Sequence, residues 1–258
     1  MKSRPQKPLL FEKLDYAYLL QFNRPAVHNA VNDVMMQALE AVLDKLEAAK
    51  DGLPVIISHV GNKTFCAGGD LKYFSSLDTP EKCRIMSLRM QSILDRLENC
   101  GHFVILAAKG QILGGGCEIL TACHYAIVAD NSQLSFRQAP NGIITGWGGG
   151  RRLIRKIGRA NALRLTLSGE RLSAEAAQRI GLAEEVIPID EVLERAKTLC
   201  IAIADNDPNA VRGFLELEKG YRSFSDERLI TLETDTFVRL WEGNTFQTIL
   251  NRFREGNK

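Results

Sequence analysis

The sequence offers little that would direct the protein to a membrane or to a nucleic acid. No stretch of its 258 residues approaches the roughly 20 consecutive apolar residues of a membrane span. Residues 1–8 are basic but lead into no apolar segment of the kind that signal peptides carry. The formal net charge is only +2, which argues against a dedicated nucleic-acid surface. These absences predict a cytoplasmic protein with no membrane and no nucleic-acid partner.

Motifs of several common enzyme classes are also missing. The six cysteines lie far apart and mostly inside apolar segments, which favours reduced core thiols over disulfides. Cys117, Cys123 and His124 are close in sequence, but no second pair of ligands is spaced to close a zinc site. There is no G-x-S-x-G elbow, no G-x-G-x-x-G turn and no Walker loop. The sequence therefore disfavours a serine hydrolase and a nucleotide-binding protein of either type, and no metal is expected.

What is present is a globular composition with alternating strand and helix patterns. The chain is 45% apolar and 25% charged, enough for a sizeable core. Strands are expected at residues 16–22, 55–57, 103–107 and 125–128, and helices at 38–50, 86–97, 114–123, 175–180 and 189–204. Beyond Pro208 the pattern is entirely helical. We therefore predict an α/β core over residues 1–200 and a helical C-terminal region over residues 201–258.

One basic run could suggest contact with nucleic acid. Arg151 and Arg152 are followed by Arg155 and Lys156, with apolar residues interleaved at helical spacing. This pattern favours the solvated face of a helix over a nucleic-acid patch.

Two glycine-rich turns carry the chemistry. The segment Gly114-Gly-Gly-Cys-Glu118 delivers one carboxylate at the start of an apolar stretch, and Phe65-Cys-Ala-Gly-Gly-Asp70 forms a second such turn upstream. Glycine lets a backbone approach a ligand closely and offer its N–H group. Two such amides make an oxyanion hole for a carbonyl oxygen that becomes an enolate or alkoxide.

These turns, with three further motifs in the same order, resemble the crotonase (enoyl-CoA hydratase/isomerase) superfamily. The further motifs are Asn23-Arg-Pro25 with Asn29-Ala30, Ser168-Gly-Glu-Arg-Leu-Ser-Ala174, and Gly181-Leu-Ala-Glu-Glu-Val186. The segment Gly142-Ile-Ile-Thr-Gly-Trp-Gly-Gly149 is locally similar to the ethylmalonyl-CoA decarboxylase branch. The resemblance implies a spiral of ββα units, an acyl-CoA substrate with no separate cofactor, and a helical C-terminal region that assembles trimers, often paired into hexamers.

The resemblance also implies roles for individual residues. The backbone amides of Gly69 and Gly115 would hold the thioester oxygen, and Glu118 would act as acid or base. The substrate would contact Ala26 and Val27 on its adenine side, Gly69, Asp70 and Leu71 along the pantetheine, Lys72 near the phosphates, and Trp147 at the acyl group. Ala67 is also expected to contact the substrate. We expect Asp70 chiefly to order its own loop.

The chain departs from the family at its second catalytic glutamate, whose position is held by Gln138. A glutamine can orient substrate or water but cannot exchange a proton at neutral pH, and loss of general acid–base assistance costs about 10²–10⁴-fold. The sequence therefore favours a one-carboxylate reaction that proceeds through an enolate, such as decarboxylation of an alkylmalonyl-type thioester, or isomerisation. A conventional enoyl-CoA hydratase is the alternative, and a non-catalytic acyl-CoA-binding or assembly protein is a further one.

Overall fold

The computed structural model of the protein describes residues 7–256, so most of the basic N-terminal stretch lies outside the described residues. A six-stranded sheet has the order β1-β2-β3-β5-β7-β10, in which only the β1–β2 pair is antiparallel. Its strands are Leu9–Lys13, Tyr18–Phe22, Val55–His59, Val104–Ala108, Tyr125–Ala129 and Glu185–Ile187. Within residues 7–256, no helix is long and apolar enough to cross a membrane.

A smaller sheet lies next to the first and has the order β4-β6-β8-β9. Its strands are Thr64–Cys66, Gln111–Leu113, Gln133–Ser135 and Leu172–Ser173, and only the β8–β9 pair is antiparallel. Three times in succession, a strand of the large sheet is followed by a strand of the small sheet and then by a helix. This repeat confirms the predicted spiral of ββα units.

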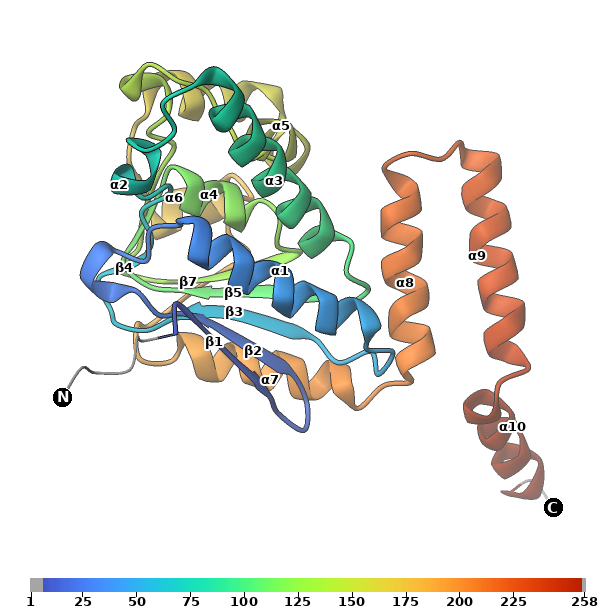
Figure 1. Cartoon of the computed structure of the whole chain (residues 1–258). Helices are drawn as coiled ribbons and strands as arrows, with labels where there is room; N and C mark the ends of the chain where they lie inside the picture. The colour runs from blue at the N-terminus through green and yellow to red at the C-terminus, as the bar shows by residue number, and fades with distance from the viewer. Residues whose placement is uncertain (1–6, 257–258) are drawn as a thin grey trace.

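The helices cover both faces of the large sheet (Figure 1). The helices of the core are α1 (Asp33–Ala48), α2 (Leu71–Phe74), α3 (Pro80–Glu98), α4 (Gly115–Leu120), α5 (Gly149–Ser168), α6 (Ala174–Arg179) and α7 (Val192–Ala204), with 3₁₀ turns η1 (Pro25–Val27) and η2 (Ala139–Asn141). Helices α1 and α3 pack in the core on one face, and α7 packs in a second apolar cluster on the other. Strands β3 and β5 are buried along their whole length, as expected for parallel strands covered on both sides.

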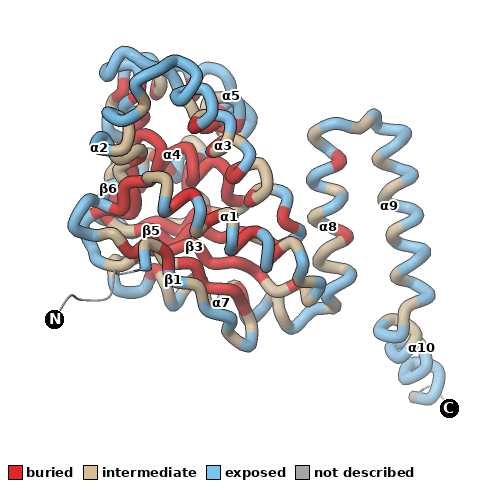
Figure 2. Tube along the Cα trace, in the orientation of Figure 1, coloured by how far each residue is buried: buried red, intermediate tan, exposed pale blue. Residues whose placement is uncertain are grey.

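The last three helices extend away from this core (Figures 1 and 2). They are α8 (Pro208–Tyr221), α9 (Asp226–Trp241) and α10 (Asn244–Gly256), which we call the C-terminal arm. The Asp207 side chain caps α8, and Pro208 takes its first position, where a missing N–H costs nothing. The expectation of helix beyond Pro208 is confirmed, while the domain boundary near residue 200 stays a prediction.

The sequence patterns missed the five-residue strand β1 and five shorter strands. Strands β4, β6, β8, β9 and β10 have two or three residues each. A period of two residues cannot be recognised over so few positions, so these strands are defined by the strands beside them rather than by their own sequence.

Candidate active site

The two glycine turns lie side by side because β4 and β6 are parallel neighbours, so the loops at their carboxyl ends meet. A Cβ added to Gly68 would come within 2.9 Å of the Gly115 amide nitrogen. Gly68 also has a φ of +97°, which only glycine adopts without strain. The sequence folds this way locally because close approach of the two loops leaves no room for side chains between them.

The amides of Gly69 and Gly115 are available to a ligand. On either side of Gly69, the Ala67 amide donates to the His28 carbonyl and the Asp70 amide donates to the Val31 carbonyl. Among the described residues, no group accepts a hydrogen bond from the amide of Gly69 or of Gly115. Gly115 is the first residue of α4, where a helix leaves its N–H groups without internal partners. Two free donors on adjoining loops can stabilise an oxyanion.

An aromatic ring covers each of these two glycines. A Cβ on Gly69 would overlap the ring of Phe74, and a Cβ on Gly115 would overlap the ring of Trp147. Trp147 is buried and Phe74 is half-buried. Packing therefore restricts both positions to glycine, while contact of Trp147 with an acyl group stays a prediction.

Glu118 lies one turn along α4 from Gly115 and is only 2% exposed. Its Oε2 accepts hydrogen bonds from the amides of Trp147 at 2.8 Å and Gly149 at 2.9 Å. Gly149 is the first residue of α5, so the positive end of that helix faces the carboxylate. Burial raises the pKa of Glu118 above its ordinary value, although these amides, Gln138 and the charge of Arg152 oppose the rise. A buried carboxyl group whose protonated form is favoured in this way can take part in proton transfer.

Gln138 lies opposite Glu118, at the start of η2. Its Nε2 donates to Oε1 of Glu118 at 3.0 Å, and it is only 7% exposed. Its own Oε1 is buried and has no hydrogen-bond partner among the described residues. The structure therefore pairs one ionisable group with a neutral amide that retains a free acceptor.

The predicted substrate-binding residues other than Trp147 lie on two segments that contact each other. Ala26 and Val27 are exposed on η1, which is joined to the glycine turn by an ion pair between Arg24 and Asp70 at 2.9 Å. Asp70 also accepts hydrogen bonds from the first amides of α2, so it orders its own loop as expected. Leu71 and Lys72 are exposed beyond it, and Ala67 is half-buried before it. Their contacts with a substrate stay predictions.

The prediction that Arg152 lies on a solvated helix face was wrong. We expected it on a solvated helix face, but its side chain is only 1% exposed. The buried positions of α5 include Gly149, Arg152, Leu153 and Ile157, so helical spacing places Arg152 on the inner stripe. The misleading signal was its charge, which is neutralised by acids of α3 that lie more than 50 residues earlier.

His124 is hydrogen-bonded to a neighbouring strand. Its Nδ1 accepts a hydrogen bond from the Val104 amide at 3.0 Å, and burial lowers its pKa to about 4. Within residues 7–256, no three His, Cys, Asp or Glu side chains are grouped to hold a metal ion.

Comparison with known proteins gives consistent matches over nearly the whole chain. The family model for enoyl-CoA hydratase/isomerase matches residues 17–258. A probable enoyl-CoA hydratase of Bacillus subtilis is 34% identical over 243 residues, which cover 94% of this chain and 93% of the relative. An ethylmalonyl-CoA decarboxylase of Mus musculus is 33% identical over 238 residues, covering 91% and 73% respectively. A crystal structure of an enoyl-CoA hydratase from Bacillus anthracis matches with a TM-score of 0.90 at 28% identity, over 96% of each chain.

Proposed function

Because the chain belongs to the enoyl-CoA hydratase/isomerase family, we propose that it acts on an acyl-CoA thioester through an enolate held by Gly69 and Gly115. The reaction that we propose first is decarboxylation of an alkylmalonyl-CoA-type thioester. The carbon–carbon bond to the carboxylate breaks, carbon dioxide leaves, and the electron pair passes into the thioester, whose oxygen takes the charge. Protonated Glu118 then gives its proton to the α-carbon and is reprotonated by water.

The observation that carries this proposal is the Glu118–Gln138 pair. Their hydrogen bond of 3.0 Å puts a neutral amide where a second carboxylate would be needed for efficient hydration. Burial favours the protonated form of Glu118, which is the form that a single reprotonating acid requires. Isomerisation with Glu118 as the sole proton carrier uses the same groups.

Conventional hydration is the second candidate. It is favoured by the free Oε1 of Gln138, which can accept a hydrogen bond from a water molecule, and by the Bacillus subtilis relative described above. A non-catalytic acyl-CoA-binding protein is disfavoured, because it has no need for a desolvated carboxyl group beside two free amides.

The test is paired turnover with crotonyl-CoA and with methylmalonyl-CoA or ethylmalonyl-CoA, with Glu118→Gln as the control. Release of carbon dioxide without hydration, lost in the variant, is the expected result. Brisk hydration that is lost in the variant would replace the proposal with the second candidate. Binding of CoA esters without turnover of either kind would favour the non-catalytic protein.

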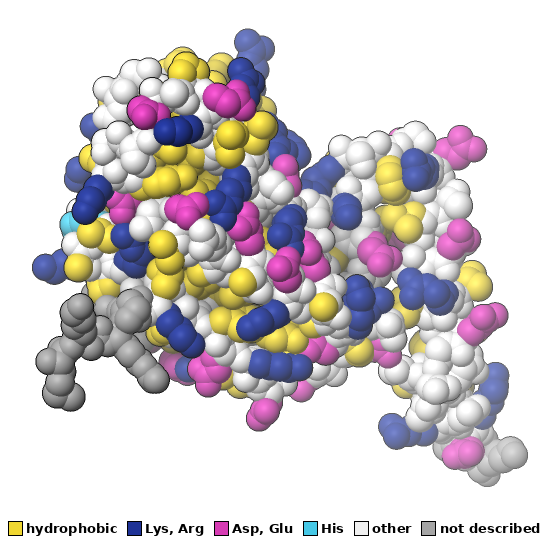
Figure 3. Space-filling view, viewed as in Figure 1, with side chains coloured by type: hydrophobic (Ala, Val, Ile, Leu, Met, Phe, Trp, Pro, Cys, Tyr) yellow, Lys and Arg dark blue, Asp and Glu magenta, His cyan; other side chains and the backbone are white. Residues whose placement is uncertain are grey.

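We also propose that the protein is a homotrimer or hexamer assembled through the C-terminal arm. Large apolar side chains are exposed on its helices, and some are visible on its surface in Figure 3. They are Phe214, Tyr221, Ile230, Phe237, Val238, Trp241, Ile249 and Phe253. Exposed apolar surface on this scale is typical of a protein interface. Sedimentation equilibrium tests the proposal, and a monomer at micromolar concentration would contradict it. A cytoplasmic location stays a prediction.

A further inference from the structure

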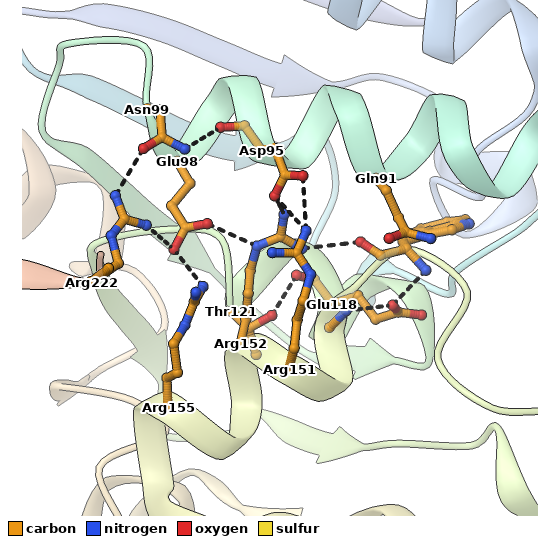
Figure 4. A network of polar contacts seen from close by, with 12 residues as sticks. Gln91, Asp95, Glu98, Asn99, Glu118, Thr121, Arg151, Arg152, Arg155 and Arg222 are labelled. Atoms are coloured by element: carbon orange, nitrogen blue, oxygen red, sulfur yellow. Dashed lines mark hydrogen bonds and ion pairs between the residues drawn. The ribbon is translucent and has the colours of Figure 1, made fainter. Parts of the chain in front are cut away.

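A buried arginine lies behind the candidate catalytic carboxylate (Figure 4). Arg152 donates from Nη1 to the Trp147 carbonyl at 3.0 Å. It donates from Nε to Glu98 at 3.0 Å and from Nη2 to Asp95, both on α3. One planar guanidinium therefore joins α3 to the loop that precedes α5.

That loop and the first residue of α5 carry the amides that bind Glu118. Two carbonyls of the loop also accept hydrogen bonds. The Gly146 carbonyl accepts from Ser87 at 2.6 Å and from Gln91 at 3.3 Å. The Trp147 carbonyl accepts from Arg152. The amides of Trp147 and Gly149 point the opposite way, to Oε2 of Glu118. Any displacement of the carbonyls therefore moves the donors that orient the carboxylate.

We infer that Arg152 is a positioning residue for the reaction, fixing the orientation of Glu118 through the Trp147–Gly149 segment. This inference rests on the proposed function, because it assumes that Glu118 carries the proton. It adds a residue that does not itself reach the substrate, since its side chain is almost fully buried.

The charges around Glu118 determine in which direction the pKa of Glu118 changes when Arg152 is replaced. Arg152 of α5 is the charged side chain that acts on Glu118, and its positive charge opposes the rise in the pKa of Glu118 that burial causes. Asp95 and Glu98 of α3 lie behind Arg152, and Gln138, Ser87 and Gln91 are neutral. The neighbouring Cys117 thiol is kept protonated, because burial raises its pKa. Removing the arginine charge is therefore expected to raise the pKa of Glu118.

Replacing Arg152 leaves neither acid of α3 without a partner. Asp95 keeps Arg151 at 2.6 Å, and Glu98 keeps Arg155 at 3.0 Å and Arg222 at 2.5 Å. Arg152→Met is therefore expected to fold. Arg155→Met is a matched control, because it removes another partner of Glu98 but has no contact with Trp147.

The first experiment measures turnover against pH for the two variants. Arg152→Met is expected to lower kcat about 10- to 100-fold with KM within about threefold, because a misplaced catalytic group affects the reacting state most. The limb of the pH profile that reports Glu118 is expected to move to higher pH, whichever protonation state is active, because the charge of Arg152 opposes the rise in the pKa of Glu118. Arg155→Met is expected to change neither. Identical kcat values and pH profiles for the two variants would overturn the inference.

Arg152→Lys separates charge from geometry. It keeps the positive charge, so the pH limb is expected to return close to its wild-type position, while kcat stays low because an ammonium group lacks the planar fork. If Arg152→Met does not fold by circular dichroism, the lysine variant decides alone, and a wild-type kcat in it would overturn the inference.

A second readout needs no substrate. In a Trp241→Phe background, Trp147 is the sole tryptophan, and its fluorescence is expected to titrate with the carboxyl group that its amide contacts. Its midpoint is expected to rise in Arg152→Met and to stay unchanged in Arg152→Lys and Arg155→Met. Equal midpoints in all of them would overturn the inference. If the wild type turns over no acyl-CoA, the proposed function fails, and this titration still tests the role of Arg152.

Discussion

The indole ring of Trp147 fills the space that a side chain on Gly115 would need, while the Trp147 amide holds the carboxylate three residues further along the same helix. Trp147 thus restricts position 115, a proposed oxyanion donor, to glycine, and it orients Glu118, the proposed acid. The chemistry of the site therefore depends on the packing of this ring.

Gly115→Ala is expected to destabilise the fold by about 1–3 kcal/mol, because its methyl group overlaps the Trp147 ring in a packed core. Urea unfolding measures the change. Gly146→Ala is the control in the same region, because its methyl group would lie 3.9 Å from the nearest side-chain atom, Ser87 Oγ. Equal stabilities of the two variants would contradict the packing that we describe.

Glu118→Gln is expected to abolish turnover and, at pH 7, to stabilise the fold. Burial makes the pKa of Glu118 higher in the folded state than in the unfolded state. Folding therefore binds a proton between the two pKa values, and the stability of the wild type falls as pH rises through that window.

The gain in the variant should disappear as pH falls below the unfolded value of about 4.3. Urea unfolding at pH 4 and pH 7 measures this difference. Glu12→Gln, at an exposed strand position, is the control and should show no such gain. A Glu118→Gln variant with wild-type turnover would remove Glu118 from the mechanism.

Gln138→Glu is expected to add hydratase activity toward crotonyl-CoA, because it restores a second carboxylate within hydrogen-bond distance of Glu118. The two acids would share a proton, so activity should fall on both sides of a pH optimum. Steady-state kinetics between pH 5 and pH 9 measure this profile. A variant that hydrates no faster than the wild type would show that the water site is not formed by these two residues.

Acid is expected to destabilise the protein through His124. Its pKa of about 4 lies below the ordinary value of about 6.5, so the unfolded state takes up a proton first as pH falls through that range. The free energy of unfolding therefore keeps its full value above pH 6.5 and falls between pH 6.5 and pH 4, by up to about 3 kcal/mol.

His124→Asn keeps an acceptor for the Val104 amide but cannot titrate, so it should show a shallower loss of melting temperature between pH 7 and pH 4.5. The control is His28→Asn at an exposed position with a φ of +52°, which asparagine tolerates. Equal slopes in the two variants would remove His124 as the acid-sensitive group.

Much of the candidate site could be predicted from local sequence because the family motifs are local. Gly69, Gly115 and Glu118 lie on turns whose glycines are visible in the sequence, and parallel pairing of β4 with β6 brings them together. Their catalytic roles remain predictions. The ββα spiral followed from the same resemblance, although its small sheet has strands too short to recognise alone.

What the sequence did not show depends on contacts between distant segments. Arg152 is buried because Asp95 and Glu98 reach it from α3, and no local pattern reports that pairing. Phe74 covers Gly69 because the four-residue helix α2 folds back over the turn. The helices of the C-terminal arm were expected from their periodicity, but periodicity does not say what their apolar faces pack against.

The uncovered arm has a consequence for the kinetics of folding. The core can bury its sheet by itself, but the apolar faces of α9 and α10 gain their full shelter only from another chain in the proposed assembly. Their final ordering would therefore be a second-order process, whose half-time shortens as protein concentration rises. At high dilution, chains with a folded core but an unassembled C-terminal arm would persist for longer, and a protease would cleave the arm first.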